Sequence, residues 1–125
     1  MEMENEIPGS SFSPNINIWS TVKNDIELKI IKGEYAAGER VPTIREMAEI
    51  YTIGNTTAQK VLESLCEDGT VFKKRGVGFF VKPFVKEKLY GLHKKSVEMR
   101  LKEVIEYAYI LSISKSELIN MIETL

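Results

Sequence analysis

Side chains suited to binding a polyanion gather in three short stretches of this sequence. The first holds Arg45, the second reads Asn-Thr-Thr-Ala-Gln-Lys over residues 55–60, and the third is Lys74-Arg75-Gly76. Arg and Lys bind phosphate groups, while Asn and Gln pair with base edges and Thr hydroxyls can serve both. Glycine lets a backbone approach a phosphate closely. These residue types therefore indicate nucleic-acid binding as their chemistry.

Residues for covalent catalysis or metal binding do not stand out. The sequence shows no paired acids and no nucleophile beside a base, and Gly76-Val77-Gly78 lacks the strand-to-helix setting of a phosphate-binding loop. No Cys/His cluster has the spacing of a zinc site, and the single cysteine, Cys66, is expected to be a small buried residue. We therefore expect no enzymatic activity, no metal and no cofactor.

The distribution of charge supports this chemistry better than its total does. The net charge is −1, so the whole chain has no basic excess. Glu2, Glu4 and Glu6 make the start acidic, whereas residues 73–102 are rich in Lys and Arg. A nucleic-acid interface must therefore be local.

Length and composition indicate a globular protein of one domain and an appendage. The chain has 125 residues, of which 43% are hydrophobic and 28% charged. The start lacks the pattern of a secretion signal, and no apolar run approaches the ~20 residues that span a bilayer. The lone cysteine fits a reducing compartment, so we expect a cytoplasmic protein with no membrane contact.

Two helices are expected before the Asn-Thr-Thr stretch. Apolar residues at three- and four-residue steps predict a helix from Ile18 to Ile31, with Trp19 as a buried or partly buried anchor. Thr43-Ile44-Arg45-Glu46 is a capping box and predicts the start of a second, short helix. Thr52-Ile53-Gly54 ends that helix, with Gly54 turning the chain.

A third helix is expected from Asn55 to Glu67, with apolar residues on one face and Asn55, Thr56, Gln59, Lys60 and Glu63 on the other. One of the hydroxyls of Thr56 and Thr57 is expected to cap the helix and the other to contact a phosphate.

Two short segments rich in β-formers, Thr70-Val71-Phe72 and Gly78-Phe79-Phe80-Val81, follow the third helix and predict a hairpin with Lys74-Arg75-Gly76 at its tip. Helix, turn, helix and hairpin in this order predict a winged helix-turn-helix, with the hairpin as the wing. Such a fold brings Arg45, Lys60 and Arg75, which lie on three separate elements, to one side.

The rest of the chain is expected to be helical. Apolar residues at three- and four-residue intervals predict a long helix from about Lys86 to Leu111, and Ser114-Lys115-Ser116-Glu117 is a capping box that starts a last short helix. The residues expected in a dimer seam are Val97, Leu101, Val104, Ala108, Leu111, Leu118 and Ile122.

The expected fold is thus mainly α with a small β-hairpin wing, followed by a two-helix dimerisation tail. Residues 1–15 are predicted to be a disordered tail, residues 16–83 a winged helix-turn-helix DNA-binding domain, and residues 84–125 a helical dimerisation region.

These stretches resemble the GntR family of bacterial transcription regulators. Its signature of a Pro-Ser-x-Arg-Glu-Leu-Ala helix and a Gly-x-Gly-Thr-Phe-Val wing is matched by Pro42-Thr43-Ile44-Arg45-Glu46-Met47-Ala48 and by Gly76-Val77-Gly78-Phe79-Phe80-Val81. The resemblance covers about Trp19 to Val81. Asn55 and Gln59 stand where the family often has Arg, and Phe79 stands where it has Thr, which makes the inner side of the wing more apolar.

By this resemblance Arg45 contacts the backbone or a base near the groove edge, the start of the third helix enters the major groove, and the wing glycine lies against the minor groove. The candidate DNA-binding residues are Thr43, Arg45, Gly54, Asn55, Thr56, Thr57, Gln59, Lys60, Lys74, Arg75 and Gly76.

The short helical tail resembles that of the YtrA subfamily, in which it serves for dimerisation. The hypothesis is a homodimeric regulator, a repressor in our interpretation, that binds a palindromic operator in double-stranded DNA. Two alternatives remain open: a winged-helix module that binds another protein, and a regulator with a small-molecule effector held at the dimer tail.

Overall fold

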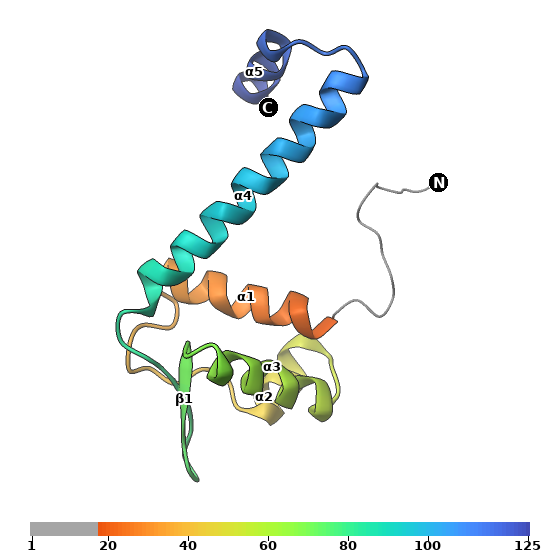
Figure 1. The fold of residues 1–125 in the computed structure, drawn as a ribbon. Coiled ribbons are helices and arrows are strands. Elements are labelled where there is room, and N and C mark those ends of the chain that lie inside the picture. The colour runs from red at the N-terminus through yellow and green to blue at the C-terminus, as the bar shows by residue number, and fades with distance from the viewer. Residues whose placement is uncertain (1–17) are drawn as a thin grey trace. The chain divides into compact units, whose positions relative to one another are not determined.

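The computed structural model describes residues 18–125, so the predicted disordered tail, residues 1–15, lies outside the described residues. Contacts divide the chain into two compact units, one ending at Glu87 and the other running from Lys88 to Leu125. The elements are α1 (Ile18–Lys32), α2 (Ile44–Tyr51), α3 (Asn55–Glu67), β1 (Val71–Lys74), β2 (Gly78–Val81), α4 (Val85–Ile110) and α5 (Lys115–Thr124) (Figure 1). The predicted fold class, mainly helical with a hairpin wing and C-terminal helices, is confirmed.

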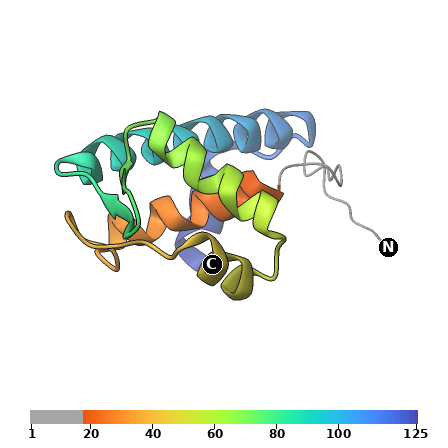
Figure 2. The ribbon, with the colours of Figure 1, turned by 90° about the horizontal axis from the view of Figure 1, so that it is seen from below.

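The core of the first unit forms where α1, α2 and α3 pack with the hairpin. Helix α1 lies across α3, and α3 also packs on α2 and β1 (Figure 2). The apolar spacing of the sequence decides this packing, because the residues at three- and four-residue steps are those that the other elements cover. The largest fully buried side chains are Ile26, Met47, Leu62, Leu65, Val41, Val61, Val71 and Val81.

The capping box predicted at the start of α2 is confirmed. The Glu46 N–H donates to the Thr43 hydroxyl over 3.1 Å, and the Thr43 N–H donates to the Glu46 carboxylate over 2.9 Å. Each side chain thus satisfies a backbone donor that the first turn of a helix leaves without a partner. Met47, one turn along, is fully buried and attaches the helix to the core.

The turn between α2 and α3 differs from the prediction. Thr52 adopts the left-handed conformation, with φ 52°, while Gly54 has φ −73° and is the N-cap of α3. Gly54, which was predicted to turn the chain, therefore lies in the turn at negative φ, and Thr52 is the residue at positive φ. A threonine is held in this conformation because the Thr52 and Ile53 N–H groups both donate to the Ala48 carbonyl at the end of α2.

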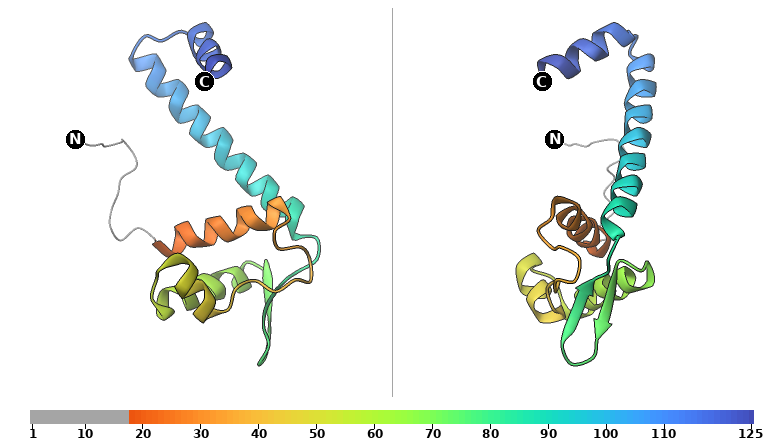
Figure 3. Two further views of the ribbon diagram at one scale, coloured as in Figure 1. Left: turned by 180° about the vertical axis from the view of Figure 1, so that it is seen from behind. Right: turned by 90° about the vertical axis from the view of Figure 1, so that its left-hand side faces the viewer.

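The wing is an antiparallel hairpin in which Val71 pairs with Val81 and Lys74 pairs with Gly78. Lys74 therefore belongs to the strand, and the turn consists of residues 75–77, shifted by one residue from the predicted tip. The Val77 N–H closes the turn by donating to the Lys74 carbonyl over 2.9 Å, and Gly76 has φ 76°. The turn projects away from the helices of its unit (Figure 3).

A third extended segment, which the sequence did not indicate, borders the wing. The Val81 N–H donates to the Glu39 carbonyl and the Val41 N–H donates to the Phe79 carbonyl, each over 2.9 Å. Arg40 forms a bridge with Phe80 between these bonds. The base of the wing is thereby attached to the chain that leads into α2, which couples the position of the hairpin to that of the helix-turn-helix.

Replacing glycine by alanine is expected to have opposite effects on stability at two positions, Gly78 and Gly91. Gly78 has φ +144°, and a Cβ there would lie 3.1 Å from Arg40 Cδ, so Gly78→Ala should destabilise the first unit by about 1–3 kcal/mol. Gly91 lies inside α4 with nothing within 4 Å of an added Cβ, so Gly91→Ala should stabilise that helix by roughly 0.5–1 kcal/mol. Urea unfolding followed by Trp19 fluorescence measures the first effect, and the melting of circular dichroism at 222 nm measures the second. A change in stability of the same sign in both variants would contradict the backbone conformations assigned to Gly78 and Gly91.

The second unit contains most of α4, together with α5. The second predicted capping box is confirmed, since the Ser114 hydroxyl accepts from the Glu117 N–H and the Glu117 carboxylate accepts from the Ser114 N–H, both over 3.1 Å. The Ile113 N–H donates to the Ala108 carbonyl and closes the turn between the helices. Among residues 18–125, no helix combines the length and apolar character that crossing a membrane requires.

Candidate nucleic-acid interface

Helix α3 has the two faces that its sequence predicts. Ala58, Val61, Leu62 and Leu65 are buried, and the opposite face exposes the polar residues Asn55, Thr56, Gln59, Lys60 and Glu63. The capping prediction was wrong, because the N-cap is Gly54 and no side chain caps this helix. The threonine hydroxyls at 56 and 57 lie within the first turn, so the start of α3 offers backbone N–H groups and hydroxyls together. This is a surface suited to phosphate or base edges.

Two residues of the exposed face of α3 are held by neighbouring side chains. The Gln59 amide N–H donates to the Glu63 carboxylate over 2.9 Å. The Lys60 ammonium lies 4.9 Å from the centre of the Trp19 ring on α1. A cation over an indole face is attracted by the ring quadrupole and keeps its charge at the surface. Trp19 is half-buried, as predicted, and it also restrains a candidate DNA-binding residue.

Helix α2 contributes a cation and a hydroxyl beside α3. Arg45, its second residue, is exposed, and α2 packs directly against α3. The hydroxyl oxygen of Thr43 accepts from the Glu46 N–H, so its role in capping is established, while its own O–H proton can still be donated. Arg45 and Thr43 thus lie at the same end of α2, on the element that crosses the candidate recognition helix.

Arg40 is a further cation at this site that the sequence analysis missed. Its guanidinium lies 3.1 Å from the Glu46 carboxylate. The Thr43 backbone N–H, and after it the Arg40 guanidinium, lower the pKa of Glu46. Arg40 precedes the Pro42 motif and belongs to no periodic segment, so only its pairing with the wing and with α2 reveals its place.

The cations of the wing lie over aromatic rings. The Lys73 ammonium is 5.8 Å from the Phe79 ring centre, and the Lys74 ammonium is 5.1 Å from that of Phe80. Phe80 also stacks on Phe72 at 5.9 Å. The aliphatic stems of the lysines therefore cover apolar surface while their charges remain in water. Phe79 is 9% exposed, which confirms the apolar inner side expected of the wing.

A hollow of about 460 Å³ is lined by residues of α3 and of the wing, together with Ile44 of α2. The lining residues are Ile44, Gln59, Glu63, Cys66, Glu67, Lys73 and Phe79. The two carboxylates repel phosphate, so a nucleic-acid backbone is expected to pass outside the hollow. Cys66 is half-buried, not fully buried as expected, and burial raises the pKa of its thiol. A thiol with a raised pKa is a poor nucleophile, in agreement with the structural role predicted for it.

Helix α1 holds α2 and α3 by polar contacts opposite to their exposed faces. The Tyr51 hydroxyl at the end of α2 donates to Asp25 over 2.6 Å, and burial, followed by this hydrogen bond, raises the pKa of Tyr51 to about 12. The Lys23 ammonium contacts the Asp68 carboxylate at 2.6 Å and the Ser64 hydroxyl at 2.8 Å near the end of α3. These contacts fix the angle between the two helices.

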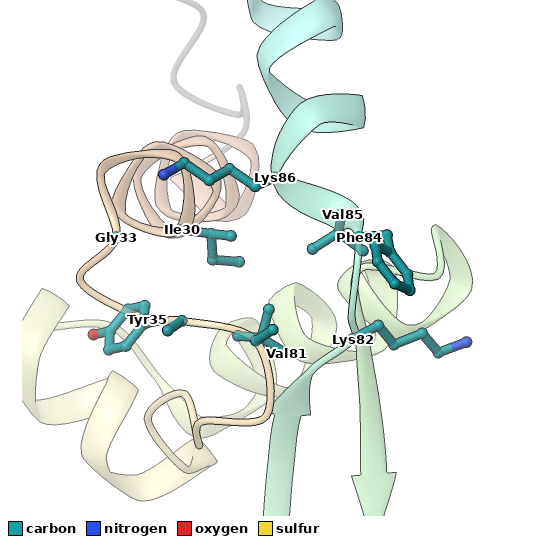
Figure 4. Close-up of a pocket in the computed structure, with 10 residues that line it drawn as sticks. Ile30, Gly33, Tyr35, Val81, Lys82, Phe84, Val85 and Lys86 are labelled. Atoms are coloured by element: carbon teal, nitrogen blue, oxygen red, sulfur yellow. The ribbon is translucent and has the colours of Figure 1, made fainter.

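An apolar hollow of about 160 Å³ opens beside the end of α1 (Figure 4). Ile30, Val81 and Val85 point into it, whereas the Tyr35 hydroxyl and the Lys82 ammonium point away. Sites for small-molecule ligands commonly have about 300–1,000 Å³, so this hollow gives little support to an effector site. Within residues 18–125 no group of three or more His, Cys, Asp or Glu side chains is arranged to hold a metal ion.

Comparison with known proteins identifies the family. The family described as "Bacterial regulatory proteins, gntR family" matches residues 19–81, which include α1, the helix-turn-helix and the wing. The chain belongs to the GntR family. It is 31% identical over 64 residues to the probable fructoselysine utilization operon transcriptional repressor of Escherichia coli. That match covers 51% of this chain and 26% of the relative, so the chain spans about a quarter of the relative's length.

Solved structures extend the likeness in fold beyond the wing. A GntR family transcriptional regulator from Listeria monocytogenes has 23% identity and a TM-score of 0.76, over 91% of this chain and 99% of that chain. YtrA from Sulfolobus acidocaldarius, a GntR-family transcription factor, has 24% identity and a TM-score of 0.52, over 96% of this chain and 94% of its own.

Membership of the family identifies residues 19–81 as the DNA-binding part of a bacterial transcription regulator. The described structure brings the exposed residues of α3, the start of α2 and the wing into one unit, where the family match also lies.

Proposed function

We propose that this chain is a homodimeric repressor that reads a palindromic operator with two copies of α3. The observation that carries the proposal is the polar face of α3, with Asn55, Thr56 and Gln59 exposed between the cations of α2 and the wing. Amide side chains form paired hydrogen bonds with adenine, and Arg and Lys bind phosphate. The proposed DNA-binding residues are the eleven candidates from the sequence analysis, and Arg40 is added to them.

The proposal assigns different tasks to these residues. Asn55, Thr56 and Gln59 contact base edges in the major groove, because they lie on the exposed face at the start of α3. Arg45 and Lys60 contact the phosphates that flank the groove. The exposed wing turn at Arg75 and Gly76 lies against the neighbouring backbone or minor groove, where the positive φ of Gly76 permits a close approach.

A dimer is proposed because the tail exposes apolar side chains that a monomer leaves in water. Val97, Leu101 and Val104 are spaced by four and three residues along α4, and Leu111 follows directly after its end. These four side chains are 47–64% exposed, values typical of a seam that needs a partner helix. Ile122 is 64% exposed and Leu118 is half-buried. Ala108 is only 4% exposed in the single chain, so it offers less surface to a partner helix than the other seam residues do.

Repression and a YtrA-like subfamily are the finer parts of the proposal. The relative from Escherichia coli is named a repressor, and the fold of YtrA matches nearly the whole of both chains. The hollow between α4 and α5, about 180 Å³, is small for an effector site, so the alternative of an effector held in the tail has no specific support.

Selection from a pool of random DNA duplexes tests the proposed function. We expect the full chain to enrich two inverted half-sites whose centres lie about one helical turn apart, because the two α3 helices of a dimer enter successive major grooves. Affinity for the selected site should fall linearly with the logarithm of salt concentration as counterions are released. Enrichment of a single half-site would contradict the dimer, and no enrichment would favour the winged-helix module that binds another protein.

A further inference from the structure

The hydrogen bond between Gln59 and Glu63 restricts what Gln59 can offer to DNA. Both side chains are exposed on α3, one turn apart, and the Gln59 amide nitrogen donates to a Glu63 carboxylate oxygen over 2.9 Å. An ionised carboxylate only accepts hydrogen bonds, so it can pair with the NH₂ end of the amide and not with its oxygen. The orientation of the Gln59 amide is thereby determined by its neighbour.

The groups that remain available on Gln59 match one base. An amide has two N–H donors and one carbonyl acceptor, and one donor is used by Glu63. One N–H and the oxygen are left. Adenine presents the complementary pair in the major groove, with N7 as an acceptor and the N6 amino group as a donor. Guanine presents two acceptors, N7 and O6, which an amide with its oxygen directed outward does not satisfy.

We propose that Glu63 is a positioning residue that sets the base specificity of Gln59 toward adenine. The inference rests on the proposed function and deepens it, because it names a base and the residue that selects it. Glu63 lines the hollow between α3 and the wing, on the side of α3 where its charge also keeps phosphate away from the amide. Glu63 therefore acts through Gln59 and needs no contact of its own with DNA.

The inference is tested by comparing base preferences of full-chain variants at each position of the selected operator. Gln59→Ala locates the base pair that Gln59 reads, since the preference at that position should disappear. At that position the unsubstituted protein should prefer adenine by on the order of tenfold, as a bidentate amide contact gives. Glu63→Ala should reduce this preference to below about threefold, because the amide is then free to rotate.

Glu67→Ala is the matched control. Glu67 is exposed one turn further along α3 and lines the same hollow, so its removal changes the local charge equally. Its loss should leave the preference for adenine unchanged. The inference is overturned if Glu63→Ala keeps the preference, if Glu67→Ala removes it equally, or if Gln59→Ala alters no base position. A protein that enriches no DNA at all would instead overturn the proposed function, and this inference with it.

Discussion

Replacing Arg45 and Arg75 together by alanine should lower affinity for the selected operator on the order of 100-fold while the protein remains folded. Both side chains are exposed, one at the start of α2 and one in the turn of the wing, so neither contributes to the core. Each loss removes a charge-assisted contact worth roughly 1.5 kcal/mol for an exposed side chain, which is about tenfold in affinity. Two fewer phosphate contacts should also reduce the slope of log affinity against log salt by about 2.

Arg100→Ala is the control for the loss of charge. Arg100 is exposed on α4, outside the winged unit, and its removal should leave operator affinity within about twofold. Titration by fluorescence anisotropy at several salt concentrations measures both affinity and slope, and circular dichroism checks the fold. Unchanged affinity in the double variant would show that DNA does not lie across α2 and the wing, and the assignment of these residues would be abandoned.

Leu101→Glu should convert the dimer into a monomer at micromolar concentration. Leu101 is 47% exposed in the single chain and lies in the apolar series of α4, so a carboxylate there is solvated in a monomer but buried without a partner in a dimer seam. Because two half-sites must then be bound independently, affinity for the full operator should fall by about two orders of magnitude or more.

The neighbouring substitution Lys102→Glu introduces the same carboxylate at an exposed polar position and should leave the dimer intact. Sedimentation velocity, or light scattering coupled to size exclusion, gives the mass of each variant. If Leu101→Glu remains dimeric while its fold is retained, the seam is elsewhere, and the exposed residues Met99, Ile105 and Ile110 on other faces of α4 are the next to substitute.

Much of the secondary structure in both units could be predicted from local patterns. The helix over Asn55–Glu67 and both capping boxes are found where the sequence places them. Helix α4 begins and ends one residue earlier than expected, at Val85 and Ile110. Periodicity and caps act over one or two turns of the chain, which is why a single sequence reveals them.

The predictions from sequence fail where backbone hydrogen-bonding groups find their partners outside the local pattern. Gly54 was expected to turn the chain, but the left-handed residue of this turn is Thr52, where two successive N–H groups share the Ala48 carbonyl. The segment at Arg40 was missed because its partners, Phe79 to Val81, lie some forty residues along the chain and no periodicity marks their pairing.

The sequence by itself determined the order of the elements, the buried face of each helix and the residue types that suit nucleic acid. Only the tertiary structure decided which side chains lie next to one another. Trp19 lies beneath the Lys60 ammonium, Arg40 lies beside Glu46, and Tyr51 at the end of α2 is bound to Asp25 of α1. These contacts join residues on separate elements, so they exist only after packing has brought the elements together. The identity of a residue limits what it can bind, and its neighbours in space decide which of its donors and acceptors remain available.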